Sequence, residues 1–289
     1  MRALDPLLDT DELGRPLLDR HLPLPALHPG DYARGHALFE ARSDQRRRVV
    51  AWLDARLAEH PADTPLSVLS VGCGPGAVDG PLAAAAGGRA VPGTVVRWTG
   101  IDPHGPSASA FDAAVRHAAP DVEVVAHACT FDRLETGERY DVVTFVHSLY
   151  YVPDVAAALH RAVGLLAPGG RLLVLHAPLG ALNELAAALA PETGGHPQWW
   201  SDTVATELRR MDVDVELEEL DAEVDLTGCG SADRALLDFT VQAELTDAAR
   251  EAVLGFLRAA ARPGDGLRLP HPVTAFTVRT SSRWSGAPR

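Results

Sequence analysis

The chain has 289 residues and is 46% hydrophobic, so it can bury a large core without help from disulfides or metal ions. Its formal net charge of −13 makes nucleic acid an unfavourable partner, because phosphate backbones are also negative. All 26 basic residues are arginine. Without lysine, Schiff-base chemistry and the phosphate-binding lysine of P-loop enzymes are excluded.

The cysteines and the N-terminal residues bear on the compartment. Cys73, Cys129 and Cys229 are far apart in the sequence and form no C-x-x-C pair, which predicts reduced thiols and no thiolate metal site. The first twenty residues carry a charge every few positions and no apolar run, and no later apolar run approaches the length of a membrane span. We therefore expect a cytoplasmic protein that binds no membrane and no metal.

The first part of the chain predicts helices, and the middle part predicts a parallel sheet. Apolar residues recur at helical spacing between Tyr32 and Glu59, which indicates one or two helices. From Leu66 onward, short apolar runs alternate with helical segments, the pattern of an α/β protein. The predicted strands are Leu66 to Val71, Val95 to Ile101, Val122 to Ala126, Tyr140 to Val146 and Gly170 to His176, each followed by a helix.

Later elements complete the sheet. The helix from Asp154 should stop at the loop Leu166 to Gly170, because proline cannot continue a helix and glycine supplies the turn. Beyond Pro197 the predicted elements are a helix from Ser201, a strand from Val213 to Leu217, helices over Asp233 to Glu244 and Asp247 to Ala260, and a strand from Val273 to Val278. The predicted fold is a Rossmann-like α/β sheet with helices on both faces.

A glycine-rich turn follows the first strand. Gly72, Cys73, Gly74 and Gly76 stand where a parallel strand passes into a helix. Residues without a β-carbon allow the backbone to bend sharply there and to approach a ligand closely. With Ala77, the segment also satisfies the dinucleotide pattern G-x-G-x-x-G/A, so the loop alone leaves a nicotinamide or flavin enzyme open.

Three further strand ends supply candidate cofactor contacts. Asp102 ends the second strand, where its carboxylate can accept hydrogen bonds from the hydroxyls of a ribose, and it follows the glycines by more than the spacing typical of dinucleotide folds. Thr130 and Phe131 follow the third strand and can border an adenine ring. The other candidates for cofactor binding near these strand ends are Pro103, Ser107 and Val146.

Together these elements resemble the class I S-adenosylmethionine-dependent methyltransferases, and the Pro168-Gly169-Gly170 turn before the fifth strand is characteristic of them. The resemblance implies S-adenosylmethionine as cofactor and S-adenosylhomocysteine as product. It divides the chain into an N-terminal segment with cap helices (1–60), a cofactor-binding core (61–180), and substrate-binding elements with the closing strands (181–289).

A finer resemblance is carried by Val146-His147-Ser148-Leu149-Tyr150-Tyr151-Val152-Pro153-Asp154, which is similar to the histamine N-methyltransferase family. Tyr32 through Ser43, Leu236 through Thr240 and Thr274-Ala275-Phe276 extend the likeness. It implies a small aromatic amine or heterocycle as methyl acceptor. The chain departs from the family at three positions. Gln45 replaces a glutamate, His147 replaces a glutamine, and the C-terminal asparagine is replaced within His271-Pro272. A cationic amine would lose its carboxylate partner, so we expect an acceptor other than histamine.

The acceptor side contains one candidate catalytic residue. His147 ends the fourth strand beside the expected methyl group, where it can orient the acceptor or take its proton. Flat aromatic side chains can stack on a ring or stabilise a cation, and adjacent tyrosines on a helix cannot share one face. The candidate acceptor-binding residues are Tyr32, His36, Phe39, Gln45, His147, Tyr150, Tyr151, Trp199, Trp200, Phe239 and His271.

The sequence therefore predicts a methyltransferase that methylates nitrogen in a small aromatic or heterocyclic molecule of the imidazole, indole or cyclic dipeptide type, in secondary metabolism. Three alternatives stay open: a small-molecule O-methyltransferase, a nicotinamide-dependent oxidoreductase, and a cofactor-binding protein without catalysis. The sequence makes no prediction of the oligomeric state.

Overall fold

The computed structural model describes residues 27–189, 192–193, 196–261, 264 and 266–280. Residues 1–26 of the predicted N-terminal segment lie outside this range. The chain forms two compact units. Unit 1 comprises Met1–Arg46, Ala177–Gln198 and Asp221–Val273, and unit 2 comprises Arg47–His176, Trp199–Leu220 and Thr274–Arg289. These units do not follow the three consecutive segments predicted from the sequence, because each unit is assembled from three separate stretches.

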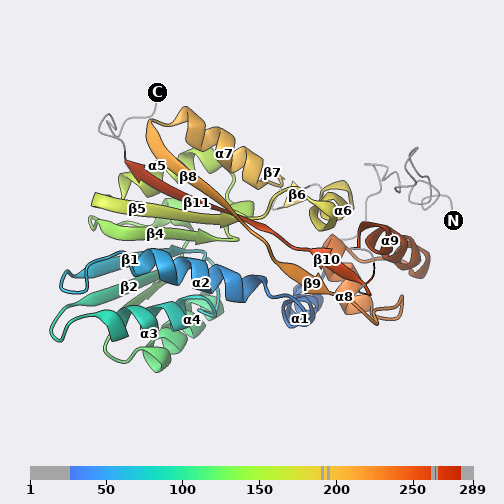
Figure 1. The fold of residues 1–289 in the computed structure, drawn as a ribbon, viewed down its shortest axis with the longest axis horizontal. Helices are drawn as coiled ribbons and strands as arrows, with labels where there is room; N and C mark the ends of the chain where they lie inside the picture. Colours follow the sequence, from blue (N-terminus) through green and yellow to red (C-terminus); the bar gives the residue numbers. More distant parts are fainter. Residues whose placement is uncertain (1–26, 190–191, 194–195, 262–263, 265, 281–289) are drawn as a thin grey trace. The chain divides into compact units, whose positions relative to one another are not determined.

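Unit 2 is built on a seven-stranded sheet with the order β3-β2-β1-β4-β5-β11-β8 (Figure 1). Its strands are β1 (Leu66–Val71), β2 (Val96–Ile101), β3 (Glu123–His127), β4 (Tyr140–Val146), β5 (Leu166–His176), β8 (Val213–Leu220) and β11 (Val273–Thr280). The first five pair in parallel, and β11 runs antiparallel to β5. The predicted Rossmann-like α/β fold is confirmed, with strand bounds that differ by a few residues.

Helices link and cover these strands. They are α2 (Gln45–Leu57), α3 (Asp79–Arg89), α4 (Gly105–Ala118), α5 (Val155–Gly164) and α7 (Ser201–Arg210). The chain moves outward from β1 to β3 and then from β4 to β5 in the opposite direction. Because parallel crossovers are right-handed, that reversal places the connecting helices on opposite faces of the sheet. The strands β1 and β4 themselves are almost wholly buried, as expected for a sheet covered on both sides.

The position where the strand order reverses lies between β1 and β4. In open α/β sheets, the loops that leave the carboxyl ends of two such strands separate in opposite directions and open a crevice for a ligand. The glycine-rich turn follows β1, and His147 follows β4. The fold therefore brings the predicted cofactor loop and the predicted catalytic residue to the same edge of the sheet.

Two element boundaries differ from the prediction for physical reasons. The segment Leu166 to Gly170, predicted as a loop, lies inside β5, and the helix ends earlier, at Gly164. The register against β4 shifts between Tyr140 and Val142, and Gly169 has φ +82°, so the turn is an irregularity within the strand. The helix predicted to reach Glu244 is α8 (Arg234–Val241), because Gln242 adopts a left-handed conformation.

Unit 1 has its own hydrophobic core. Its helices are α1 (Pro29–Glu40), α6 (Ala181–Leu189), α8 and α9 (Asp247–Ala260), and its strands are β6 (Glu192–Thr193), β7 (His196–Pro197), β9 (Glu223–Asp225) and β10 (Arg268–Pro270). The core consists of side chains such as Leu237 and Leu257, and it shares no residue with the core of unit 2. Unit 1 thus has the packing of a small domain although its segments are separated in the sequence.

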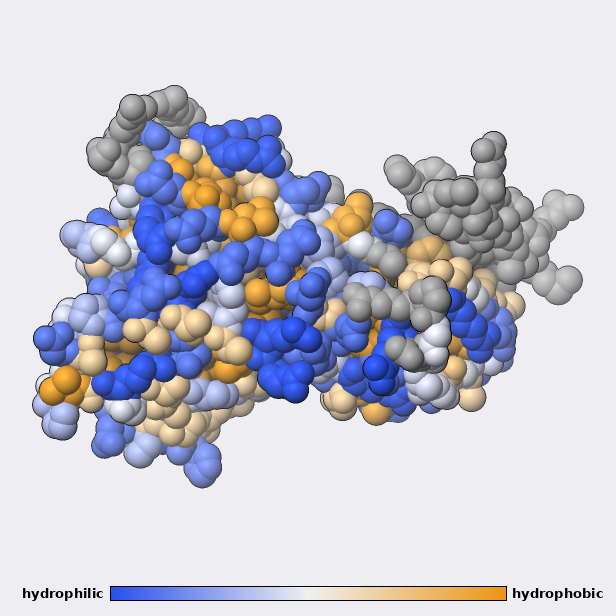
Figure 2. Space-filling view, viewed as in Figure 1, coloured by the Kyte–Doolittle hydropathy of each residue, from blue (hydrophilic) through white to orange (hydrophobic). Residues whose placement is uncertain are grey.

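The surface offers no continuous apolar band in the view of Figure 2, where hydrophilic residues predominate and apolar ones form small groups. Among the described residues, no helix is long and apolar enough to cross a membrane. The same residues contain no group of three histidine, cysteine or acidic side chains placed to hold a metal ion.

Candidate functional site

The glycine-rich turn after β1 requires glycine at several positions. Gly72, Gly74 and Gly76 have φ values of +68°, +54° and +80°, a region that other residues rarely adopt. A β-carbon on Gly72 would clash with the side chain of Ser148, whereas one on Gly74 would meet nothing within 4 Å. The turn is therefore packed against the protein at Gly72 and open at Gly74, which is the arrangement that a close-fitting ligand needs.

The side chain of Asp102 is hydrogen-bonded to this turn. Its Oδ2 accepts a hydrogen bond from the Gly74 amide at 3.0 Å, and its Oδ1 accepts one from the His104 amide at 2.8 Å. A carboxylate has about four acceptor positions, so two more are available to the hydroxyls of a ribose. Pro103 is exposed beside it. Ser107, in the first turn of α4, has its hydroxyl 2.9 Å from His104 Nδ1.

Cys73 adds no reactive group to the turn. Its side chain is buried, and burial raises the pKa of the thiol far above its usual range, with smaller contributions from the charges of Asp79 and Asp102. Cys73 is thus a neutral packing residue. Its neighbour Asp79, at the start of α3, accepts a hydrogen bond from Trp98 Nε1 at 2.8 Å, which fixes the beginning of the helix against β2.

The residues after β3 lie differently from what the sequence predicts. Phe131 is 7% exposed and packs edge to face on Phe145 at 5.4 Å between ring centroids, and the Arg161 guanidinium lies over the Phe131 ring at 5.2 Å. Its ring belongs to the core of unit 2 and is not an open platform for adenine, which corrects the predicted contact. Thr130 is exposed, and its hydrogen bond to Asp132 is the largest cause that lowers the pKa of that carboxyl.

The end of β4 carries the strongest backbone outlier of the site. His147, which follows Val146, has φ +51°, an uncommon conformation for a residue other than glycine. Its amide donates to the Leu175 carbonyl at 2.9 Å, and its Nδ1 lies 3.3 Å from the Tyr150 hydroxyl. Strained residues of this kind concentrate at functional sites. The role of His147 at the acceptor stays a prediction.

Tyr150 and Tyr151 have different environments, as expected for neighbours on one short helix. Tyr150 stacks on the ring of His176 at 4.0 Å and meets Trp200 edge to face at 6.0 Å. Tyr151 is 59% exposed. Tyr150 therefore belongs to a group of aromatic rings with His147, His176 and Trp200, and Tyr151 stands at its margin.

Trp199 holds a fixed position in unit 2. Its indole Nε1 donates to the Val152 carbonyl at 2.8 Å, its own carbonyl lies 2.9 Å from His176 Nε2, and its side chain packs on the core of unit 2. Trp200 follows as the residue that precedes α7. Trp199 thus anchors the segment, and the ring of Trp200 meets Tyr150 edge to face.

The remaining predicted acceptor residues gather in unit 1. Phe239 of α8 is surrounded by Tyr32, His36 and Phe39 of α1, with ring centroids 5.3 to 5.5 Å away. Gly35 lets the two helices approach, because a β-carbon there would clash with Phe239. These four side chains form an aromatic cluster within unit 1, and their contact with the acceptor stays a prediction.

Gln45 and His271 have roles in the architecture of unit 1. Gln45 is 5% exposed, and its side-chain amide donates to the His271 carbonyl at 2.9 Å. The His271 Nδ1 lies 2.8 Å from the Ser43 hydroxyl, and the ring meets Phe39 edge to face at 5.0 Å. The buried amide of Gln45 is therefore committed to the backbone, which corrects the expectation that it contacts the acceptor.

Two residues of the site were not among those predicted from the sequence. Ser148 donates to the Val71 carbonyl at 2.6 Å and so ties the end of β4 to the end of β1. His176 ends β5 and is fully buried. The rule that ligands lie at the carboxyl edge of a parallel sheet would have identified His176, since it closes a correctly predicted strand.

A comparison with known proteins decides the family. The model of a methyltransferase domain matches residues 41–220, which is more than half of the chain. This chain belongs to that methyltransferase family. The family consists of class I S-adenosylmethionine-dependent enzymes. The predicted enzyme class and cofactor are therefore confirmed. The comparisons give no support to the nicotinamide-dependent alternative that the glycine loop left open.

Relatives of the methyltransferase match over part of their length. Ubiquinone biosynthesis O-methyltransferases from Alkalilimnicola ehrlichii and a Bradyrhizobium species are 37% and 33% identical over 109 and 110 residues. Each match covers 37% or 38% of this chain and only 39% of the relative. Among solved structures, the YcgJ protein of Bacillus subtilis has a TM-score of 0.55 at 13% identity, covering 80% of this chain and 98% of that one, which shows the shared fold. The comparisons do not support the finer resemblance to histamine N-methyltransferase.

Proposed function

We propose that this methyltransferase transfers a methyl group from S-adenosylmethionine to a small aromatic or heterocyclic acceptor. One observation carries the proposal: the paired strands β1 and β4 bring the glycine turn with Asp102 and the ring group of His147 and Tyr150 to the same edge of the sheet. The first pair suits the adenosine part of the cofactor, and the second suits a flat acceptor.

The residues of the crevice fit the cofactor. Gly74 leaves room for a ligand beside its backbone, and the Asp102 carboxylate retains acceptor capacity for hydroxyl groups. When bound, the cofactor supplies a methyl group on a positively charged sulfur. Ser148 holds the two strand ends together, so that the crevice keeps its shape as the ligand enters.

The chemistry required of the protein is mainly placement. The bound cofactor would supply its methyl group to a lone pair of the acceptor, and the protein would hold the two in line and help the acceptor to lose one proton. His147 is placed to orient the acceptor or to take that proton, with Tyr150 on its Nδ1 side. The rings of Tyr150 and Trp200 supply apolar faces against which an aromatic acceptor can stack.

Two atoms are candidates for the site of methylation, a nitrogen and an oxygen of the acceptor. One candidate is the nitrogen of a neutral or weakly basic heterocycle, as the sequence predicts. The names of the curated relatives favour oxygen instead, because both are O-methyltransferases. A histidine beside the acceptor can take a proton from either a ring nitrogen or a hydroxyl. A role in secondary metabolism and a cytoplasmic location remain predictions from the sequence.

Methylation of a defined panel tests this proposal. The protein is incubated with S-adenosylmethionine and imidazoles, indoles, cyclic dipeptides or phenols, and products are detected by mass spectrometry and assigned to nitrogen or oxygen by NMR. We expect methylation of at least one class and a large loss of turnover in His147→Ala with S-adenosylhomocysteine affinity retained. Binding of S-adenosylhomocysteine with no product from any class would favour the alternative of a cofactor-binding protein without catalysis.

A further inference from the structure

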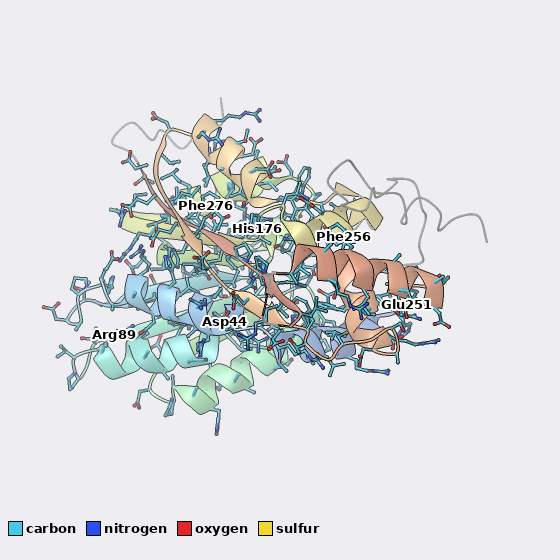
Figure 3. The ribbon with its side chains drawn as sticks, turned by 45° about the vertical axis from the view of Figure 1, so that its right-hand side comes forward. Asp44, Arg89, His176, Glu251, Phe256 and Phe276 are labelled. Atoms are coloured by element: carbon cyan, nitrogen blue, oxygen red, sulfur yellow. The ribbon has the colours of Figure 1, made fainter. Side chains whose placement is uncertain are left out.

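His176 lies at the ligand edge of the sheet, next to the proposed catalytic residue. It is the last residue of β5, and the pairing of Val146 with Leu175 places it beside the end of β4. The side chain is 0% exposed. The residue is labelled in Figure 3. One face of its ring is covered by Tyr150, which in turn reaches His147.

The two nitrogens of His176 have opposite roles. Nε2 lies 2.9 Å from the Trp199 carbonyl, and a carbonyl only accepts, so Nε2 carries the hydrogen and donates it. In a neutral imidazole the other nitrogen then presents a lone pair. Within the described part of the chain, Nδ1 is buried and has no hydrogen-bond partner.

The charge state of the ring keeps Nδ1 an acceptor. Burial lowers the pKa of His176 to about 3, with a further lowering by His147 and an opposing effect of the Trp199 carbonyl. The imidazole is therefore neutral near pH 7. Buried acceptors that lack a donor are uncommon in folded proteins because they are costly, and each one calls for a partner that the protein itself does not supply.

We propose that Nδ1 of His176 accepts a hydrogen bond from an N–H or O–H group of the methyl acceptor and thereby selects acceptors that carry such a group. This rests on the proposed function. Because the His176 ring is fully buried, the acceptor reaches Nδ1 only when neighbouring side chains shift. Because the imidazole nitrogen is neutral, it does not favour a cationic substrate, whereas a carboxylate at the same place would.

Side-chain NMR on the intact protein tests the proposal without a mutation. Protein labelled with ¹⁵N in its histidines is saturated with S-adenosylhomocysteine and titrated with imidazole or phenol as probes, and with 1-methylimidazole or anisole as matched compounds that lack the donor. The His176→Gln spectrum assigns the signal. We expect the donors to move the Nδ1 resonance of His176 and the methylated compounds to leave it unchanged.

Two variants separate the nitrogens. His176→Gln keeps an amide donor that can reach the Trp199 carbonyl but has no acceptor near Nδ1, whereas His176→Asn places an amide oxygen near the position of Nδ1. We expect imidazole to bind about tenfold more weakly to the glutamine variant and within about threefold of wild type to the asparagine variant, with 1-methylimidazole unaffected by either change.

Two outcomes overturn the inference: a resonance that no donor moves, and one that the methylated compounds move equally. Titration calorimetry of wild type with S-adenosylhomocysteine separates this failure from that of the proposed function. Absence of cofactor binding contradicts the proposed function, whereas cofactor binding with an unresponsive Nδ1 contradicts the role of His176 alone.

Discussion

The Asp102 carboxylate accepts hydrogen bonds from the amides of Gly74 and His104, so it shapes the glycine turn, and we propose that it also binds the cofactor. Hydrogen bonds to a charged group contribute about 1.5–3 kcal/mol each. We expect Asp102→Asn to weaken S-adenosylhomocysteine binding by roughly 10- to 100-fold in titration calorimetry. The control is Asp112→Asn on α4, a carboxylate paired with Arg116, which should bind as wild type does. Equal affinities of wild type and Asp102→Asn would remove Asp102 from the site.

Asp79 gives the fold a dependence on pH. Burial raises the pKa of this carboxyl from 3.8 to about 6, while hydrogen bonds from Trp98 and Ser70 act in the opposite direction. The folded state thus binds the proton more tightly than the unfolded state. The stability contributed by the protonated form is complete below about pH 4 and is lost as the pH rises through 6.

We expect the free energy of unfolding of wild type, relative to Asp79→Asn, to fall by up to about 3 kcal/mol between pH 4 and 7. Urea unfolding at several pH values measures the difference. His176, whose lowered pKa acts in the opposite direction over the same range, is present in both proteins and cancels. A difference that does not change with pH would show that Asp79 is ionised throughout.

Individual residues were predictable from the sequence where the backbone dictated them. Gly72, Gly74, Gly76 and Asp102 follow from the geometry of a strand that passes into a helix, and the structure has them in those places. The positions of Phe131 and Gln45 were not predictable, because an aromatic or amide side chain beside a site can turn into the core or toward it. Only the tertiary packing decides between these orientations.

At the scale of elements, the glycine turn is the most demanding part of the cofactor site. Gly72→Ala combines a left-handed backbone with a clash against Ser148, so we expect a loss of at least about 2 kcal/mol in stability together with loss of S-adenosylhomocysteine binding. Gly88→Ala in α3 is the matched control, because its β-carbon meets nothing and helices favour alanine by up to about 1 kcal/mol.

Urea unfolding and calorimetry on the two alanine variants measure both effects. If Gly72→Ala were as stable as Gly88→Ala and bound the cofactor equally well, the turn would not be constrained in the way its φ angle implies.

Whole elements were predicted more reliably than their ends. The helix Asp247–Ala260 has the predicted bounds because Thr246 caps its first turn, whereas β5 begins four residues before the predicted Gly170. Pro168 and Gly169 are turn residues in isolation, but in the sheet they form an irregularity that pairing with β4 accommodates. Sequence patterns indicate which residues bend the chain, and the neighbouring strand determines whether pairing stops there.

At the scale of the molecule, the two separate cores make a prediction about unfolding. Leu257 lies in the core of unit 1 and Leu173 in the sheet of unit 2, and both are 0% exposed. Truncation of such a leucine to alanine costs about 2–5 kcal/mol. Since the proposed cofactor residues belong to unit 2, we expect Leu257→Ala to bind S-adenosylhomocysteine within about threefold of wild type.

Differential scanning calorimetry with and without S-adenosylhomocysteine locates the effect. Ligand that binds only the folded form stabilises it by about 2.7 kcal/mol at a hundred times its dissociation constant. We expect S-adenosylhomocysteine to raise the temperature of the unfolding transition that Leu173→Ala lowers. If it raised only the transition lowered by Leu257→Ala, the cofactor site would have to be sought in unit 1.

The interleaved order of the segments limits how recombination can alter unit 1 during evolution. Unit 1 is contributed by three stretches that alternate with those of unit 2 along the chain. A single recombination event between two related genes would therefore join parts of unit 1 from different parents and mismatch its core. New aromatic surfaces around Phe239 are more readily reached through successive point substitutions, or in the laboratory through grafting all three stretches at once.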